Sequence, residues 1–526
     1  MKKRVLFIPL DNRPCTYKMP IRVGRVANLE LITPPEKLLG RFHKPGDCEE
    51  IIKWIQEIEG NFLGAIISTD MPIYGGLVAS RKMIANEETA KTRLEKLLHA
   101  IKLKKEKLGK VYLFSSLFRN APTYLDESFI PLIEKVIKFS VESYHAGKGD
   151  DRAKRVIEKL KKDIPPKMLN EYLSVRRRNF SVNKILIEKA KDGIFDFLLI
   201  GIDDSKIVGL NIQEKEKLQA IIESEDVNDR VMISTGTDEA TSLLLSRLLC
   251  DMTGINPRVL PVYSNPEGKK ITGRYEDRSF EDVIKLQVRT AGGVLTAPDE
   301  DADMHLYVHT PSGRQKEAGG QTLHLGGRKN LMDFTCSIDM SLKSGISATI
   351  ADVFYANGAD NIFARALVDN INILSLSGFA AWNTAGNSLG TAIAHGIVKT
   401  IAGKIVVDEE ERESSLRSHV FLLLERFVDD WLYQSNVRPR MCTEALWKRV
   451  SIYHLDEQTE YFENRIQDRL SEGAVKLMES MRGNEIGKIS PEKSLFFSPL
   501  DTPSIKLPWG RLFEVSVGFH KENLFS

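Results

Sequence analysis

Short apolar runs alternate with amphipathic segments through residues 1–310. Eight of these runs have the length and composition of buried β-strands, at residues 4–9, 29–33, 63–69, 110–117, 195–202, 230–235, 258–263 and 304–309. Amphipathic segments such as 47–59, 87–107 and 240–253 lie between them. Strands that alternate with helices form parallel sheets with right-handed crossovers. We therefore predict an α/β chain whose residues 1–310 form a (β/α)8-barrel-like catalytic domain, with two doubly wound α/β lobes as the alternative.

One connection between the predicted strands is unusually long. Residues 120–193 contain a highly charged stretch, 145–178, that ends in three arginines. This composition predicts a helical excursion. It either covers the strand ends as a lid or lies outside as a solvated helix pair.

The rest of the chain is predicted to divide into two further regions. Residues 311–404 form a second α/β region, in which 333–341 and 348–356 are predicted strands and the Ala- and Gly-rich stretch 379–403 is a predicted, tightly packed helix. Residues 405–526 are predicted to be mostly helical and to end in a closing strand around 506–519. They open with the acidic run DEEERE, which suits the N-terminus of a helix.

Acidic side chains recur where predicted strands end. Asp11, Asp70, the doublet Asp203–Asp204 and the doublet Asp238–Glu239 each follow such a strand. The loops at the carboxyl ends of parallel strands converge, and they carry the active sites of α/β enzymes. A single Asp at such a position could cap a helix, but the recurrence predicts a shared acidic pocket.

The doublets Asp203–Asp204 and Asp238–Glu239 supply the candidate catalytic residues. Carboxylates held together in a partly dry pocket separate in pKa, so one can serve as acid and the other as base or nucleophile. Hydrolysis of a glycosidic bond uses such a pair and needs no cofactor. The same oxygens suit Mg²⁺ or Mn²⁺, which is the alternative. A structural role also stays open, in which Thr237 or Asp238 caps the helix 240–253.

Two further segments carry candidate substrate-binding residues beside the predicted strand ends. Asp11 and Arg13 lie in a loop stiffened by prolines, which suits recognition of hydroxyls or carboxylates. Asp70, Tyr74 and Arg81 surround Gly75-Gly76, which permits an unusual backbone path. An internal Asp–Arg pair and a simple glycine turn are the structural alternatives.

The segment WNTAGN adds Trp382, Asn383 and Asn387 to the candidate binding residues. An indole ring beside amides can bind a sugar, with the apolar sugar face on the ring and the hydroxyls on the amides. The two asparagines share a face if the segment is helical. A buried helix whose amides satisfy nearby backbone is the alternative.

Two other polar groups are given structural interpretations. The arginines 176–178 fit a solvated helix face better than an anion site. His305 and His309 alternate with apolar residues on a predicted strand, and without a third ligand nearby they are expected to be structural.

Composition narrows the functional classes. The net charge of +2 gives no field that favours nucleic acid or an anionic membrane, so neither is an expected partner. Five scattered cysteines form no CxxC pair, and no uninterrupted apolar run reaches membrane-spanning length. The apolar stretch after the N-terminal lysines is too short for a signal peptide, so we expect a cytoplasmic location. Nucleotide-binding and serine-hydrolase motifs are absent, and the oligomeric state stays open.

Together these motifs resemble a bacterial family catalogued as domain of unknown function 4127. The pattern PLD-x-RP, a D-x-x-x-YGGL-x-x-SR block, RN-x-x-x-N, DDS, G-x-DE and WNT-x-x-N occurs in this order over about residues 4–395, on Asp11, Arg13, Asp70 to Arg81, Asn179, Asn183, Asp203 to Ser205, Gly236 to Glu239 and Trp382 to Asn387. The family has a second Asp where Asn12 stands, and Ala-Pro-Tyr where this chain has Lys206-Ile207-Val208. The second departure bears on substrate contacts beside Asp204.

The resemblance implies a family but no reaction, so the functional hypothesis rests on the acidic strand ends. We expect a glycoside hydrolase-like enzyme that acts on a small glycan or glycoside. Glu239 or Asp204 is the expected general acid, and Asp203 or Asp238 is the partner carboxylate. A metal-dependent sugar isomerase or hydrolase and a non-catalytic sugar-binding protein of two lobes are the alternatives. Adjacency of strands 195–202 and 230–235 in one closed barrel would distinguish them.

Overall fold

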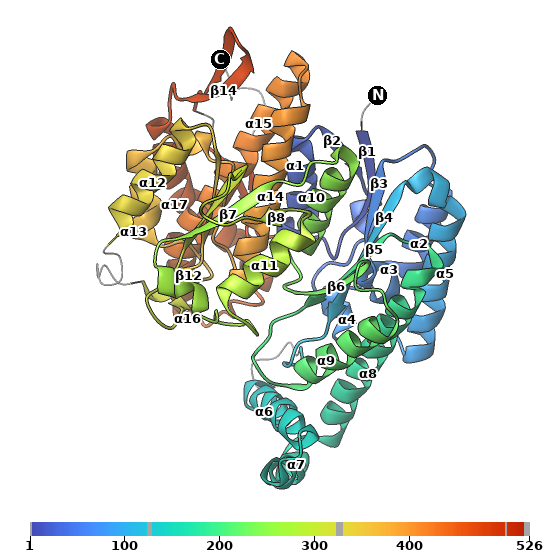
Figure 1. Cartoon of the computed structure of the whole chain (residues 1–526). Coiled ribbons are helices and arrows are strands. Elements are labelled where there is room, and N and C mark those ends of the chain that lie inside the picture. Colours follow the sequence, from blue (N-terminus) through green and yellow to red (C-terminus); the bar gives the residue numbers. More distant parts are fainter. Residues whose placement is uncertain (1–2, 124–128, 322–329, 500–501, 520–526) are drawn as a thin grey trace.

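The computed structural model describes residues 3–123, 129–321, 330–499 and 502–519, and its core is two open parallel sheets (Figure 1). The first sheet has the strand order β2-β1-β3-β4-β5-β6. Its strands are β1 (Lys3–Ile8), β2 (Leu29–Ile32), β3 (Gly64–Ser68), β4 (Lys110–Leu117), β5 (Phe197–Ile202) and β6 (Val231–Thr235). Every neighbouring pair in this sheet is parallel.

Helices cover both faces of the first sheet. Successive residues of each strand point to opposite faces, and the residues on both faces are apolar. In β1, Val5 and Phe7 pack into one core and Leu6 and Ile8 into another. The first face carries α1 (Met19–Val26) and α10 (Ala240–Thr253). The second face carries α2 (Cys48–Glu57), α5 (Glu87–Leu108), α8 (Pro166–Glu188) and α9 (Leu210–Ser224). Burial on both faces explains the continuous apolar runs of the sequence.

The second sheet repeats the topology of the first. Its strands are β7 (Arg258–Tyr263), β8 (Val294–Leu295), β9 (Met304–His309), β11 (Ser347–Asp352) and β13 (Gly378–Ala380), in the order β13-β11-β9-β7-β8. In both sheets the second strand lies on one side of the first strand and the later strands lie on the other. Such an order places a switch point beside the first strand, where the flanking loops diverge and leave a crevice. The second sheet takes strands from both sides of residue 310.

A layer of helices joins the two sheets. The helices α11 (Phe280–Thr290) and α14 (Ala385–Ile405) pack with α1 and α10 between the sheets (Figure 1). One hydrophobic cluster contains Phe7 of the first sheet, Leu389 of α14 and Leu306 of the second sheet. The outer face of the second sheet is covered by α12 (Leu331–Lys343), α13 (Asn361–Asn370) and α15 (Glu409–Arg426).

The α/β prediction is confirmed, and the barrel is not. All eight predicted strands of the N-terminal part are present, and β5 and β6 are parallel neighbours as expected. Within the described ranges, however, no sheet closes on itself. The strands instead divide between two open sheets, as in the two-lobed alternative. The eighth predicted strand, β9, pairs with β7 and β11 and not with β1.

The predicted strand 333–341 is wrong, because this segment is the helix α12. Its buried residues are Leu331, Phe334, Thr335, Ile338 and Ser341, which recur at helical spacing. The prediction for 348–356 is confirmed by β11 and by the short strand β12 (Tyr355–Ala356), which pairs with β10 (Lys316–Glu317). The predicted packed helix begins only at Ala385, after β13.

The long connection is helical, as predicted. It forms α6 (Ile130–Gly147) and α7 (Asp151–Asp163), which project from the body of the molecule, and then α8 (Figure 1). The solvated-face interpretation of the three arginines holds only for Arg177. Arg176 is buried and paired with Glu214 at 2.6 Å. Arg178 is buried and donates to the carbonyls of Ser80, Lys82 and Ala85.

The C-terminal part is mainly helical. After α15 come the π-helical segment η8 (Phe427–Val437), α16 (Arg438–Trp447) and α17 (Thr459–Ser480), followed by the antiparallel pairs β14 (Glu485–Ser490) with β15 (Lys493–Phe496) and β16 (Ser504–Lys506) with β17 (Ser516–Gly518). Asp408 caps the acidic N-terminus of α15. No helix in the described part of the chain is long and apolar enough to cross a membrane.

Candidate active site

A cavity of about 470 Å³ lies where the carboxyl ends of the first sheet face the loops of the second. It is lined by seven of the residues predicted from the sequence: Arg13, Arg81, Asp203, Asp204, Asp238, Asn383 and Asn387. Further polar and aromatic lining residues were not predicted and include Phe42, His43, Arg119, Tyr275, Glu276, Thr384, Tyr453, His454, Arg511 and Phe513. The structure therefore brings acids of both doublets, Asp203, Asp204 and Asp238, together in one pocket, whereas Asp11, Asp70 and Glu239 do not line it.

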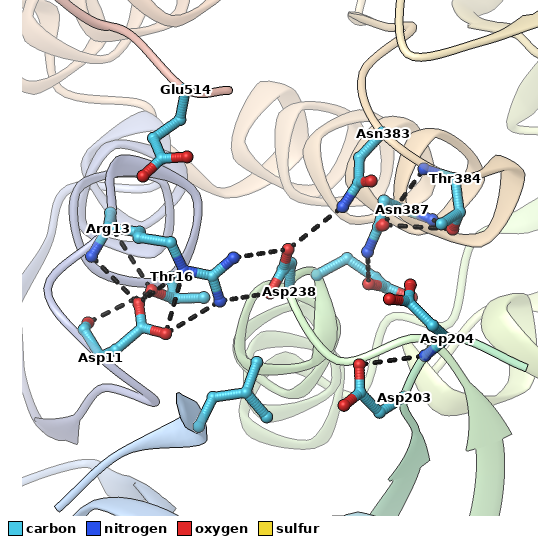
Figure 2. A network of polar contacts seen from close by, with 12 residues as sticks. Asp11, Arg13, Thr16, Asp203, Asp204, Asp238, Asn383, Thr384, Asn387 and Glu514 are labelled. Atoms are coloured by element: carbon cyan, nitrogen blue, oxygen red, sulfur yellow. Dashed lines mark hydrogen bonds and ion pairs between the residues drawn. The ribbon is translucent and has the colours of Figure 1, made fainter. Parts of the chain in front are cut away.

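Arg13 links two of the acidic strand ends (Figure 2). Its Nη2 donates to Asp11 Oδ2 at 2.8 Å and to Asp238 Oδ1 at 2.7 Å, and its Nη1 donates to Asp238 Oδ2 at 3.1 Å. Asn383 donates to Asp238 Oδ2 from the other side at 3.3 Å. Burial raises the pKa of Asp238 although Arg13 opposes the shift. Asp11 and Arg13 thus form the internal pair that was one interpretation of their sequence, extended to Asp238.

The doublet after β5 points its two carboxylates in different directions. Asp203 is buried and accepts from Arg81 Nε at 2.8 Å. Asp204 is exposed for 45% of its side chain and pairs with Arg119 Nη1 at 3.0 Å. Adjacent residues on an extended chain face opposite ways, so only one of them can project freely into the cavity. That residue is Asp204.

The doublet after β6 is also split, and Glu239 lies below the cavity surface. Glu239 is buried and accepts from Gln287 at 3.0 Å and from Asn387 at 2.6 Å. Burial raises its pKa to about 8. Gly236, with a positive φ of 91°, passes so close that a Cβ there would overlap the Glu239 carboxyl. Glu239 therefore supports the loop and the helix α14 from inside.

Glu276 is a buried carboxyl that lines the cavity. It lies at the N-terminus of α14, where Oε1 accepts from the N–H of Gly386 at 2.6 Å. Its Oε2 is buried and has no partner with hydrogen-bonding geometry among the described residues. Burial raises its pKa to about 7 in spite of the Gly386 N–H and the nearby Thr384 hydroxyl, and Asp204 adds to the rise. This carboxyl therefore holds a proton close to neutral pH.

Three predicted binding residues lie away from the cavity. Asp70 is buried and accepts from the hydroxyl and the N–H of Ser116, at 2.7 and 2.9 Å. Tyr74 is buried under the guanidinium of Arg178. Trp382 is 7% exposed and lines a small internal void instead. Its indole ring offers no open face to a sugar in this cavity.

Aromatic rings and C-terminal residues form the rim of the cavity. Tyr275 and Tyr453 are 39% and 48% exposed. Arg511 lies over the ring of Phe42 at 4.9 Å, which ties the C-terminal segment to the loop before α2. Trp509 donates to Asn12 at 2.8 Å and packs against the Arg13 guanidinium. Sequence spacing gave no sign of this rim, since its members come from turns far apart in the chain.

The comparisons with known proteins decide the family but not the activity. The family model described as "Protein of unknown function (DUF4127)" matches residues 5–518. This chain belongs to that family. No curated protein and no solved structure is similar enough to match it. The resemblance inferred from the strand-end motifs is thus confirmed, and it extends over nearly the whole chain.

The two departures from the DUF4127 pattern have different surroundings. Asn12 uses its Oδ1 to accept the hydrogen bond from Trp509, a role that an Asp can also fill. Lys206 and Ile207 are exposed and do not line the cavity. Among the described residues, no group of three His, Cys, Asp or Glu side chains is arranged to hold a metal ion.

Proposed function

We propose that this DUF4127 protein hydrolyses a glycosidic bond in a small glycan or glycoside bound in the 470 Å³ cavity. The composition of the cavity lining favours a neutral, hydroxyl-rich ligand. Four arginines and four acids line the cavity, so neither sign of charge is in strong excess. Exposed tyrosine rings at the rim offer apolar faces, and the amide of Asn383 offers hydrogen bonds.

The observation that carries the proposal is the state of Glu276. A general acid must be protonated at working pH and must have a free oxygen toward the substrate. Burial raises the pKa of Glu276 to about 7, and its Oε2 has no partner within the described ranges. We assign Glu276 the role of proton donor to the leaving group, in place of Glu239, which is enclosed behind it.

Asp204 is the partner carboxylate in this proposal. It is the most exposed acid of the two doublets, it lines the same cavity as Glu276, and its charge adds to the burial that raises the pKa of Glu276. The ion pair with Arg119 holds the carboxylate of Asp204 at the cavity, where a base or nucleophile would act. Asp203, Asp238 and Asp11 then hold the arginines that position the substrate.

A non-catalytic sugar-binding role is the second candidate, because the cavity lies between two α/β lobes. Proteins of that type bind ligand by closure of the lobes and do not turn it over.

We further propose a cytoplasmic location, since all five cysteines are free thiols, as is usual in a reducing compartment.

The test is turnover of two matched substrate panels, with and without EDTA. Nitrophenyl α- and β-glycosides have good leaving groups, whereas disaccharides with the same sugar need a protonated leaving oxygen. Hydrolysis of both panels, unaffected by EDTA, would support the proposal. Loss of activity in EDTA would instead indicate that the carboxylates bind a metal ion needed for the reaction. Saturable binding of a sugar without any turnover would refute hydrolysis and support the binding protein.

A further inference from the structure

A second, smaller cavity lies near the far end of α14. It measures about 210 Å³ and is enclosed by α14, the first turns of α15 and β14. Thr384, at the N-terminus of α14, borders the cavity of the proposed active site, whereas Lys399 on the same helix lines this one. With a rise of about 1.5 Å per residue, the two positions are roughly 22 Å apart along the helix. The two cavities are therefore separate sites.

The lining of the small cavity contains three cations and no acid. Lys399 comes from α14, Arg412 from α15 and Lys488 from β14. Within the described part of the chain, none of these three side chains forms a hydrogen bond or an ion pair that would offset its charge. The neighbouring acid, Glu413, is already paired with Arg417 at 2.5 Å and with Lys493 at 3.6 Å.

A cation without a partner is costly where it is removed from water, which applies to the half-buried Lys399 and Arg412 more than to the exposed Lys488. Removing a charge from water is unfavourable unless an opposite charge or hydrogen bonds replace the water. Burial and the charge of Arg412 lower the pKa of Lys399 to about 8. Its charge also helps to lower the pKa of the buried His395, to about 3, and that of His419. No acid among the described residues lines the cavity to relieve this repulsion.

We infer that the cavity formed by Lys399, Arg412 and Lys488 binds a phosphate-sized oxyanion. Lysine ammonium groups bind phosphate as point charges, and an arginine fork adds directed hydrogen bonds. Gly403 and Gly487 line the same cavity without side chains, which leaves room for a tetrahedral ion. An anion there would neutralise the cluster and connect α14, α15 and β14. This inference does not depend on the proposed hydrolase activity.

The test compares thermal unfolding of the full-length protein in phosphate and in chloride at equal ionic strength. Because the folded state alone presents the three cations together, phosphate should raise the midpoint progressively with concentration, above any effect of chloride. Lys399→Met keeps the volume of the side chain and removes its charge. It should abolish the phosphate-specific rise, and titration calorimetry with inorganic phosphate should show affinity weakened about tenfold or more.

Matched variants make the result decisive. Lys404→Met lies on the same helix but outside the cavity, where Lys404 pairs with Asp303, so it should keep the full response to phosphate. Lys488→Met changes a second cation of the cavity at an exposed position, where the fold should tolerate it. It should also weaken the response to phosphate, so the inference can be tested even if the Lys399 variant fails to fold. In chloride, Lys399→Met should equal or exceed the wild-type midpoint, because it removes an unpaired charge. An equal response of the wild type to phosphate and chloride would overturn the inference, as would a response retained in both cavity variants.

Discussion

Two adjacent carboxyls in the loop before α11 show how local partners set protonation. Burial raises the pKa of Glu276 to about 7, whereas the pKa of Asp277 is lowered to about 2. Burial acts on both residues, but Asp277 is paired with Lys215 at 2.6 Å and with Arg278 at 3.0 Å. Glu276 accepts from a backbone N–H and lies near a hydroxyl, and no cation among the described residues is paired with it. Environments that separate the pKa values of neighbouring carboxyls in this way are typical of acid–base sites.

Replacing Glu276 should separate the two substrate panels. Glu276→Gln keeps the shape and can still accept from Gly386, but it cannot donate the catalytic proton. We expect kcat on disaccharides to fall by about 10²–10⁴-fold. Turnover of nitrophenyl glycosides should fall much less, because their leaving group needs little protonation. Steady-state kinetics on both panels measures this ratio, and circular dichroism checks the fold. An equal loss on both panels would contradict the role of Glu276 as proton donor.

The buried carboxyl of Glu239 should make stability depend on pH. Its pKa is about 8 in the folded protein and 4.5 when unperturbed. Between these values the unfolded chain releases the proton and the folded protein keeps it, so this group's contribution to stability falls as the pH rises. For one group the slope is about 1.4 kcal/mol per pH unit.

Comparison of the wild type with Glu239→Gln isolates this slope, because other groups titrate in both proteins. Urea unfolding from about pH 5.5 to 7.5 should show the wild type losing stability relative to the variant by about 1.4 kcal/mol per unit. Parallel stability curves would show that Glu239 ionises normally.

At the residue scale, sequence reasoning found the acids that directly follow strands and missed partners that come from elsewhere. Arg119 follows β4 by two residues, so the strand-end rule could have included it. Glu276 follows no apolar run, and only the fold of the loop onto α14 places it in the cavity. Which member of each doublet faces the cavity depends on the pleat and on the arginines opposite, Arg13 and Arg81, and neither is readable from spacing.

At the scale of elements, α14 connects the proposed active site to the core. Thr384 and Asn387 form a capping box at its start, and Asn387 also donates to Glu239. Gly390 lies one turn later, and a Cβ there would be 2.3 Å from Glu239 Cγ. The Gly- and Ala-rich composition predicted close packing of this helix correctly. The identity of the partner, a buried carboxyl, could be learned only from the structure.

Two glycines of α14 should respond to substitution with opposite signs. Alanine is favoured over glycine in a helix by about 1 kcal/mol, so Gly403→Ala, which meets nothing within 4 Å, should stabilise the protein by roughly 0.5–1 kcal/mol. Gly390→Ala should instead destabilise it by about 1–3 kcal/mol, because the overlap with Glu239 outweighs the propensity. Urea unfolding of both variants measures the difference. Stabilisation by both would show that Glu239 can move away freely.

Periodicity decided which elements were predicted correctly. The eight strands predicted within residues 1–310 are short apolar runs bounded by polar turns, and their positions agree with the structure to within about two residues, whereas the short strands β8 and β13 were not predicted. The segment 333–341 has a β-compatible composition, but its buried positions recur at helical spacing and it forms a helix. Strand pairing, by contrast, depends on contacts between distant segments, which one sequence does not display.

At the scale of the whole molecule, the two sheets have the same strand order but share one core. An alternating β/α pattern is equally consistent with a barrel and with two open sheets, because each unit makes the same right-handed crossover. The structure resolves this through β2 and β8, which lie on the opposite side of β1 and β7 from the later strands. At each switch point the flanking loops diverge and leave a crevice. The loops of the first sheet border the 470 Å³ cavity.

The shared core predicts that the two sheets unfold together. Lobes joined only by a hinge would melt as separate units, with relative motion between them. Here α14 is packed between the sheets, and Leu389 is fully buried in the cluster that also holds Phe7 and Leu306. Calorimetry should therefore show one transition. Leu389→Ala should cost about 2–5 kcal/mol and shift that transition as a whole. Two transitions, of which Leu389→Ala moves only one, would show that the lobes are independent. That outcome would favour a hinged sugar-binding protein over a preformed hydrolase site.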